Sequence, residues 1–197
     1  MNKKLPKKSA VFLTLLLLAS IASAAPNKNL GVAQADPGMG LKNFREILSS
    51  LSVVTGVPVT APDVSAYYTQ VVSGLPRYGN LSEFNPQSFL ADLGLASVFC
   101  NHVIGTDVSV SGVVKSGPNA GVDFSQGPSH VSAAQRDKLA QNYISQFLQR
   151  TPTDTERTQL TQLFGAMTDA KDTADETQAS VLAVCSAVAG SIEFLSN

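Results

Sequence analysis

The stretch that decides the fold is NPQSFLADLGLASVFCNHVIG, residues 85–105. Asn85 is a helix-capping residue and Pro86 suits the first helical position, so the pair predicts a helix start. The apolar side chains that follow, from Phe89 to Ile104, cover more than one narrow stripe of a helix. A helix that is apolar on several sides is surrounded by other elements. We therefore expect the central helix of a bundle here, ending at Gly105.

Five further segments show apolar residues at helical spacing. Residues 41–54 form one amphipathic face that ends at Gly56, and the next helix has Thr60 as its cap with Pro62 in the first turn. The others span residues 132–149 or begin with the T-x-x-E pattern of a capping box at Thr153 and Thr173. In the last of them, the residues expected to face inward are Val181, Val184, Cys185, Val188, Ile192 and Leu195. The sequence predicts an all-α fold, a single bundle of about six helices.

Residues 105–128 depart from this pattern, because glycine and proline interrupt them and Val108 to Ser111 alternate with a period of two. At 24 residues the segment is longer than the connections usual in a helical domain. We expect one long irregular loop with a β-like pattern, a short strand or a hairpin. Two interpretations remain open. Either Val113, Val114 and Phe124 fold back as a lid, or the segment offers an edge for strand addition, with these candidate partner-binding residues: Val108, Val110, Val113 and Val114.

The chain begins with the three parts of a secretory signal peptide. A basic segment, an apolar segment and an A-x-A cleavage site follow one another: Lys3 to Lys8, Val11 to Leu18, and Ala22 to Ala24. The apolar run is too short for a membrane anchor, which needs about 20 residues. We expect a signal peptide over residues 1–24, a flexible lead segment over 25–38 and a helical domain over 39–197. Exported proteins of this kind are periplasmic, or extracellular at the cell surface.

Cleavage would change the charge balance, since four lysines leave with the signal. The mature chain keeps 10 basic and 15 acidic residues, a net charge of about −5. A negatively charged chain has no electrostatic reason to bind nucleic acid or an anionic membrane. We expect neither nucleic-acid binding nor membrane insertion after signal cleavage.

The two cysteines lie far apart, and each falls on the apolar face of a predicted helix. In an exported chain this pattern favours one structural disulfide, between Cys100 and Cys185. A redox-active pair is the alternative, but such pairs usually keep their cysteines two residues apart.

Residues that carry chemistry are sparse. His102 and His130 have no second ligand at a metal-binding spacing, and nucleotide-binding, thioredoxin and serine-hydrolase motifs are absent from the sequence. The acidic residues Asp169, Asp172, Asp175 and Glu176 cluster at a helix start, where acids usually face solvent. The aromatic side chains of the first three helices fit a core better than a ligand pocket. We expect no enzyme activity, no catalytic or metal site and no cofactor.

Several short motifs resemble a helical module of exported bacterial proteins that also carry LamG-type domains: Thr55-Gly56-Val57-Pro58, Tyr68, Leu75-Pro76, Phe89-Leu90, Phe99-Cys100-Asn101 and Val122-Asp123-Phe124. The C-terminal half is similar to the closing helices of planctomycete-type cytochrome c associated domains: Arg150-Thr151-Pro152, Glu156, Val184-Cys185 and Ser191 to Leu195. The resemblance implies a helical, disulfide-linked module of the cell envelope or surface, without an assigned activity. The chain itself has no C-x-x-C-H haem motif.

These observations predict a non-enzymatic exported bacterial protein that serves as a structural or interaction module of the periplasm or cell surface. Its partner would be another envelope or surface protein. Two alternatives stay open: a hydrolase whose site combines residues distant in the sequence, and a carrier of a small apolar ligand.

Overall fold

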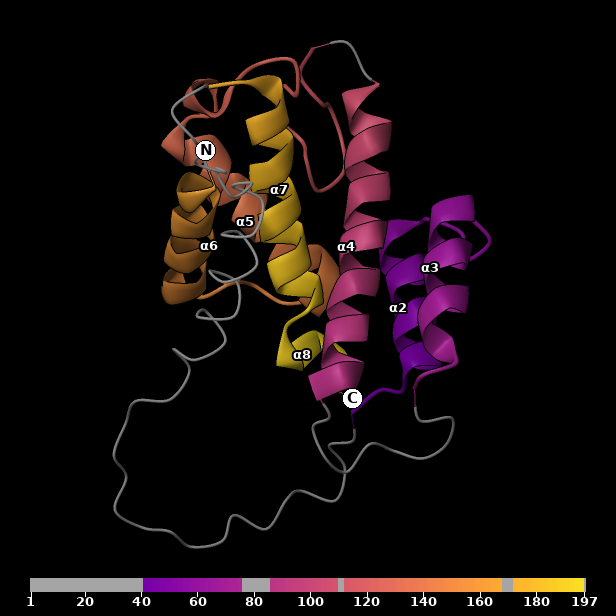
Figure 1. Cartoon of the computed structure of the whole chain (residues 1–197). Coiled ribbons are helices and arrows are strands. Elements are labelled where there is room, and N and C mark those ends of the chain that lie inside the picture. The colour runs from indigo at the N-terminus through magenta and orange to yellow at the C-terminus, as the bar shows by residue number, and fades with distance from the viewer. Residues whose placement is uncertain (1–40, 76–85, 110–111, 168–171, 197) are drawn as a thin grey trace, which may run out of the picture. The chain divides into compact units, whose positions relative to one another are not determined.

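The computed structural model describes residues 41–75, 86–109, 112–167 and 172–196. The predicted signal peptide and lead segment lie outside these ranges, as do Asn85, Val110 and Asp169. The described helices belong to one unit, in which α4 is the central element (Figure 1).

Helices account for most of the described residues. They are α2 (Phe44–Thr55), α3 (Pro62–Val72), α4 (Pro86–Val108), α5 (Ala133–Leu148), α6 (Asp154–Ala166), α7 (Ala174–Ala189) and α8 (Ile192–Leu195), with a short 3-10 turn, η1 (Pro128–His130). No β-strand occurs among the described residues, although two isolated β-bridges do. The predicted all-α bundle is confirmed.

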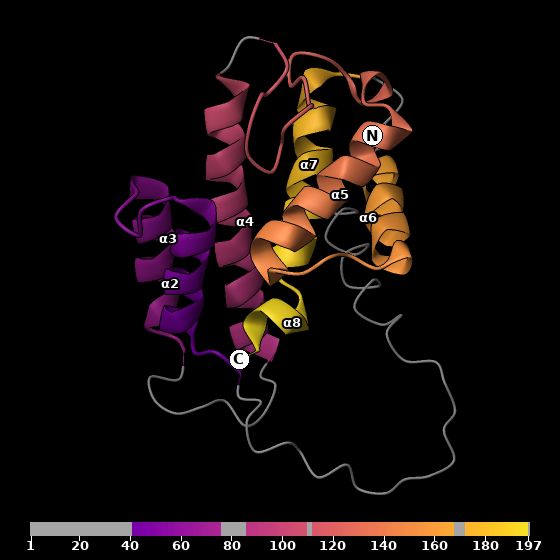
Figure 2. The same cartoon turned by 180° about the vertical axis from the view of Figure 1, so that it is seen from behind.

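The helices form two groups on opposite sides of α4. One side is covered by α2 and α3, whereas α7 packs on the other and is itself covered by α5 and α6. Figures 1 and 2 show α4 between the two groups from the front and from behind. By length and composition α4 is also the one described helix that could cross a membrane. A core helix meets the same criterion, and here α2, α3 and α7 cover it.

Local signals set most helix boundaries. The side chain of Asn43 accepts the backbone N–H of Glu46, and Glu46 accepts the N–H of Asn43, which closes a capping box at α2. Gly56 ends that helix in the left-handed region, at φ 72°, which glycine adopts without steric cost. The predicted box at Thr153 and Glu156 is confirmed at the start of α6.

Other predicted boundaries are wrong. The cap of α3 is Ala61 rather than Thr60, with Pro62 as its first residue as expected. Gly105 does not end α4, which continues to Val108. A glycine inside a helix costs only about 1 kcal/mol, and Asp107 in the extra turn accepts a hydrogen bond from Asn119 at 2.7 Å. That contact from the following segment favours the longer helix.

The last predicted helix is also different in detail. Thr173 caps α7, but its side chain makes no capping hydrogen bond, so the predicted box with Glu176 is not formed. The helix ends at Ala189, and α8 begins anew after Ser191. This restart changes the helical phase, and Ile192, expected to face inward, is 65% exposed.

The predicted disulfide is confirmed. Cys100 in α4 and Cys185 in α7 are bonded, with their Cα atoms 5.9 Å apart and both side chains buried. The bridge joins residues 85 positions apart. In the chain-entropy model, a cross-link that closes a loop of that size restricts the denatured state and so stabilises the folded state by about 4 to 5 kcal/mol.

Two glycines of α4 provide a matched test of this packing. A Cβ at Gly94 would overlap the hydroxyl and ring of Tyr67, whereas a Cβ at Gly105 meets no atom within 4 Å. We expect Gly105→Ala to stabilise the protein by about 0.5 to 1 kcal/mol through helix propensity. Gly94→Ala should destabilise it by about 1 to 2 kcal/mol, because overpacking outweighs that gain. Urea unfolding followed by circular dichroism measures both, and a Gly94→Ala variant more stable than the parent would contradict the α3–α4 packing.

Candidate functional site

The segment after α4, residues 112–131, combines irregular backbone with the exposed side chain of Val113. We call it the crossing loop, because it passes over one end of α4, α7 and α5 (Figure 2). Hydrogen bonds with α4, α5 and α7 hold it in position.

A buried polar chain holds its centre. The hydroxyl of Tyr143 in α5 donates to Asn119 Oδ1 at 2.6 Å, and Asn119 Nδ2 donates to Asp107 in α4 at 2.7 Å. Both Tyr143 and Asn119 are fully buried. Burial raises the pKa of Tyr143 far above its usual value, and the hydrogen bond to Asn119 offsets this only in part. The tyrosine is therefore a neutral donor at every physiological pH.

Further hydrogen bonds attach the loop on both sides of this centre. From α5, Gln135 donates to Gly121 O at 2.8 Å and Asn142 to Pro118 O at 3.1 Å. From α7, Thr177 donates to Gln126 O at 2.8 Å. The crossing loop is thus a defined surface supported by three helices.

Its first part is a miniature hairpin. Val114 donates its N–H to Val122 O, and Gly121 donates its N–H to Val114 O, both at 2.8 Å. Val113 forms an isolated antiparallel bridge with Asp123. The backbone groups of Val114 therefore face the hairpin. Those of Val113 and Lys115 face away from it, and their amides make no hydrogen bond among the described residues.

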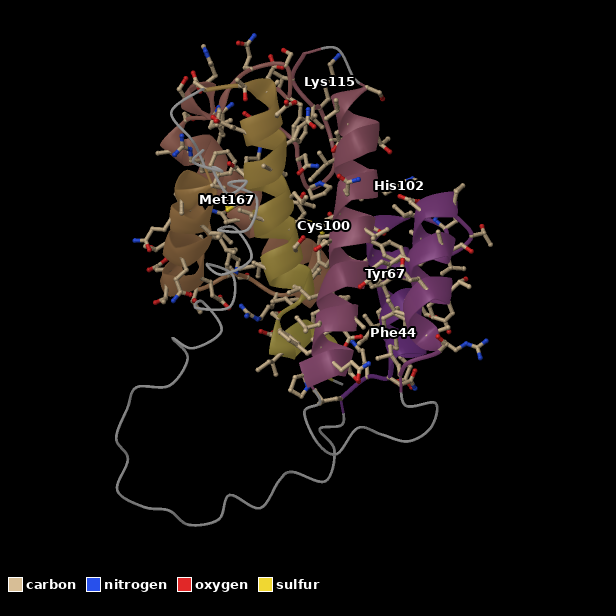
Figure 3. The ribbon with its side chains drawn as sticks, viewed as in Figure 1. Phe44, Tyr67, Cys100, His102, Lys115 and Met167 are labelled. Atoms are coloured by element: carbon tan, nitrogen blue, oxygen red, sulfur yellow. A yellow bond between two sulfur atoms is a disulfide. The ribbon has the colours of Figure 1, made fainter. Side chains whose placement is uncertain are left out.

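The predicted partner-binding valines take different positions. Val108 is the last residue of α4 and 38% exposed, and Val113 is 49% exposed. Val114 is buried at 4%, as the lid interpretation expects, and Phe124 is buried as well. Val110 lies outside the described residues. The alternation of exposed and buried side chains occurs at Val113, Val114 and Lys115, a few residues later than the sequence suggested (Figure 3 labels Lys115).

The two histidines, Asp172 and Asp175 are at least partly exposed. His102 contacts Asp63 of α3 at 3.2 Å, and His130 is exposed on η1. Asp172 accepts hydrogen bonds from the hydroxyl and the N–H of Ser129, and these lower its pKa. Among the described residues, no three histidine, cysteine or acidic side chains lie close enough to hold a metal ion.

A second surface feature was not foreseen from the sequence. An open groove of about 470 Å³ lies between α2, α5 and α8, with Val53, Phe147 and Leu148 among its lining residues. Val53 is 83% exposed. The carboxylate in its lining, Glu193, forms an ion pair with Arg150 at 2.6 Å. That pairing neutralises the negative charge of Glu193, while Lys42 also lines the groove.

One buried acid also escaped the sequence reasoning. Asp92 in α4 is 6% exposed, and its Oδ1 atom has no hydrogen-bond partner. Burial raises its pKa to about 7. The sequence did indicate this burial, because Asp92 lies among the apolar residues of the central helix.

Comparison of the chain with protein-family models, with curated proteins and with solved structures finds no match.

The buried polar chain predicts how the loop responds to mutation. Tyr143→Phe removes the hydroxyl and leaves Asn119 Oδ1 buried without its donor, which should cost about 1 to 3 kcal/mol. Tyr68→Phe is the matched control, because the Tyr68 ring stacks on Phe44 and its hydroxyl makes no hydrogen bond among the described residues. Thermal unfolding compares the two. Equal melting temperatures for both variants would contradict a supporting role for the Tyr143 hydroxyl.

Proposed function

We propose that this protein is an exported, disulfide-stabilised helical module that binds an extended segment of another envelope or surface protein. The outward edge of the crossing loop, at Val113 and Lys115, is the observation that carries the proposal.

Export is supported by two independent features. The N-terminal residues carry the pattern of a cleaved signal peptide. The Cys100–Cys185 bond is typical of an oxidising compartment, such as the periplasm or the outside of the cell. Both features are compatible with export.

Strand addition is supported by the geometry of the edge. A peptide that adds to a strand needs free main-chain donors and acceptors on one side and a supporting partner on the other. Val113 and Lys115 present the outward main-chain groups, and the hydrogen bonds of Val114 with Gly121 and Val122 support the strand from the other side. The exposed Val113 side chain adds an apolar contact. Because the loop is held by α4, α5 and α7, binding would require little ordering of the backbone.

The two alternative functions find less support. A hydrolase of the glycosidase kind needs two carboxylates across one cleft, whereas the groove between α2, α5 and α8 has Glu193 as its acid, ion-paired with Arg150. A carrier of apolar ligands needs an enclosed cavity, and this groove is open to solvent.

The mass of the natural protein tests export. We expect protein isolated from the periplasm or the medium to begin at Ala25, and to be lighter by two hydrogens than the reduced chain. Intact-mass spectrometry with and without reductant measures both. A chain that retains residues 1–24, or that reacts with a thiol reagent before reduction, would contradict the proposal.

Two variants at one position test the binding mode. Lys115→Pro removes the outward N–H group, whereas Lys115→Ala removes the charged side chain and keeps that N–H. With the mature protein as bait on extracts of its own envelope, we expect Lys115→Ala to retain a captured protein that Lys115→Pro loses. Quantitative mass spectrometry gives the amounts, and equal melting temperatures establish that both variants are folded.

Other outcomes would contradict main-chain pairing at this edge. Loss with both variants would indicate recognition of the lysine charge, and retention with both would indicate that the edge is not used. Val113→Asp serves as a second disrupting variant, with Val53→Asp in the distant groove as its control.

A further inference from the structure

The groove between α2, α5 and α8 has walls that direct contacts join to one another. Lys42 donates its backbone N–H to Leu195 O at 2.8 Å, which connects the start of α2 to the end of α8. Gln146 of α5 donates from Nε2 to Val54 O of α2 at 2.7 Å. Because these contacts bring the three helices together around the groove, a ligand would bind with little ordering of its walls. Figures 1 and 2 show α8 at the opposite end of the bundle from the crossing loop.

One part of the groove is apolar. The rings of Phe147 in α5 and Phe194 in α8 line it, with their centroids 5.7 Å apart, and Leu148 lies next to them in the lining. On the α2 side, the strongly exposed side chain of Val53 borders the same space. Ligand sites are commonly lined by aromatic and aliphatic side chains around a few polar groups. This part of the groove therefore suits one apolar group of a ligand.

A positively charged group lies beside the apolar part. Lys42 Nζ donates to Phe194 O at 2.8 Å and lies 5.0 Å from the centroid of the Phe194 ring. These two contacts hold the ammonium in place, and it pairs with no carboxylate among the described residues. An ammonium has three N–H donors, of which the carbonyl takes one. Two donors of a charged group are left for an anion.

The other polar groups nearby favour an anion as well. The hydroxyl of Ser50 lines the groove and an adjoining hollow along α2, and it makes no hydrogen bond within the described chain. Glu193 is paired with Arg150. In the adjoining hollow, the side chain of Arg45 has no acid partner among the described residues, whereas Glu46 belongs to the capping box of α2. The charge without a partner here is positive and complements an anionic ligand.

The spacing of the ammonium and the ring restricts the ligand further. Since Lys42 Nζ is 5.0 Å from the ring centroid, a carboxylate bound to Nζ must lie close to any apolar group on that ring. In the last residue of a polypeptide, the α-carboxylate and the side chain are attached to the same Cα atom. An acidic side chain inside an extended segment lies on a different residue from the apolar one, and successive side chains point to opposite sides. The spacing therefore favours a chain end.

We propose that this groove binds the free carboxyl terminus of a polypeptide that ends in an apolar residue. The carboxylate takes hydrogen bonds from Lys42 and Ser50, and the last side chain packs on Phe147 and Val53. Capture of a terminal carboxylate is an established mode of peptide recognition. The open side of the groove leaves room for the rest of the partner chain. The inference concerns a second surface and does not depend on the proposed binding edge.

Nuclear magnetic resonance of the mature protein, titrated with short peptides, tests this proposal. The probes are five-residue peptides of alternating serine and glycine that end in leucine, valine or phenylalanine with a free carboxylate. We expect amide shifts in residues 42–55, 144–149 and 192–196. Amidation of the peptide terminus should weaken binding at least about tenfold, because it removes a charge-assisted hydrogen bond. A peptide that ends in aspartate should bind as weakly, since it lacks the apolar side chain.

Variants then assign the contacts. Lys42→Gln removes the positive charge and should weaken the binding of the free-carboxylate peptides at least about tenfold. Val53→Asp places a negative charge at the same site and should have a similar effect. Because Val53 is exposed, its variant should fold even where Lys42→Gln fails to. Lys138→Gln, at an exposed lysine earlier in α5, and Val113→Asp, in the crossing loop, should bind the peptides as the parent protein does.

Several outcomes would overturn the proposal. One is the absence of shifts with all three apolar peptides at millimolar concentration, and another is a set of shifts confined to the crossing loop. Equal binding of the amidated peptides would indicate recognition of the apolar group alone, and equal binding of the aspartate peptide would indicate recognition of any acid. Decanoate binding as tightly as the peptides would assign the groove to small amphiphiles. Shifts that follow protein concentration without peptide would assign it to a second copy of this chain.

Discussion

The close approach of α4 and α7 is the contact on which the other packing relations depend. The bond between Cys100 and Cys185 holds their Cα atoms 5.9 Å apart, and Ser97 and Ser186 meet at 3.2 Å beside it. A Cβ at Gly190 would collide with Leu93. Large side chains at these positions would separate the helices beyond the reach of a disulfide. Because α7 occupies one side of α4 so closely, the apolar residues on its remaining sides must be covered by α2 and α3.

Where the sequence predicted the fold well, one local signal decided the outcome. Thr153 caps α6 as predicted, because its side chain and that of Glu156, three residues later, each bond the backbone amide of the other without help from the rest of the protein. The same kind of capping box forms at Asn43 and Ser132, where it was not predicted. The predicted stop at Gly105 was wrong because a local cost of about 1 kcal/mol opposed the hydrogen bond between Asp107 and Asn119. Contacts of that kind depend on the tertiary fold and cannot be inferred from the residues next to Gly105 in the sequence.

The candidate binding edge was predicted in part. The length and the glycine content of residues 105–128 correctly indicated an unusual segment, and its valines indicated a β-like pattern. The sequence could not place that pattern at Val113 to Lys115. Which of these side chains is buried depends on two tertiary contacts, the hydrogen bond between Val114 and Val122 and the one between Tyr143 and Asn119. Nor could it show the groove at Val53, which forms only when three helices separated in the chain meet.

The two sides of α4 are held by different kinds of interaction, and this difference has consequences for the dynamics of the protein. A covalent bond connects α4 to α7, and the hydrogen bonds of Asn119 with Asp107 and Tyr143 connect α4 to α5. On the other side, α3 is attached by a long hydrogen bond from Tyr67 and the half-exposed contact of His102. Local opening follows the weakest set of contacts in a fold. The layer of α2 and α3 can therefore loosen while the crossing loop, whose supports all belong to the disulfide-linked side, stays in place.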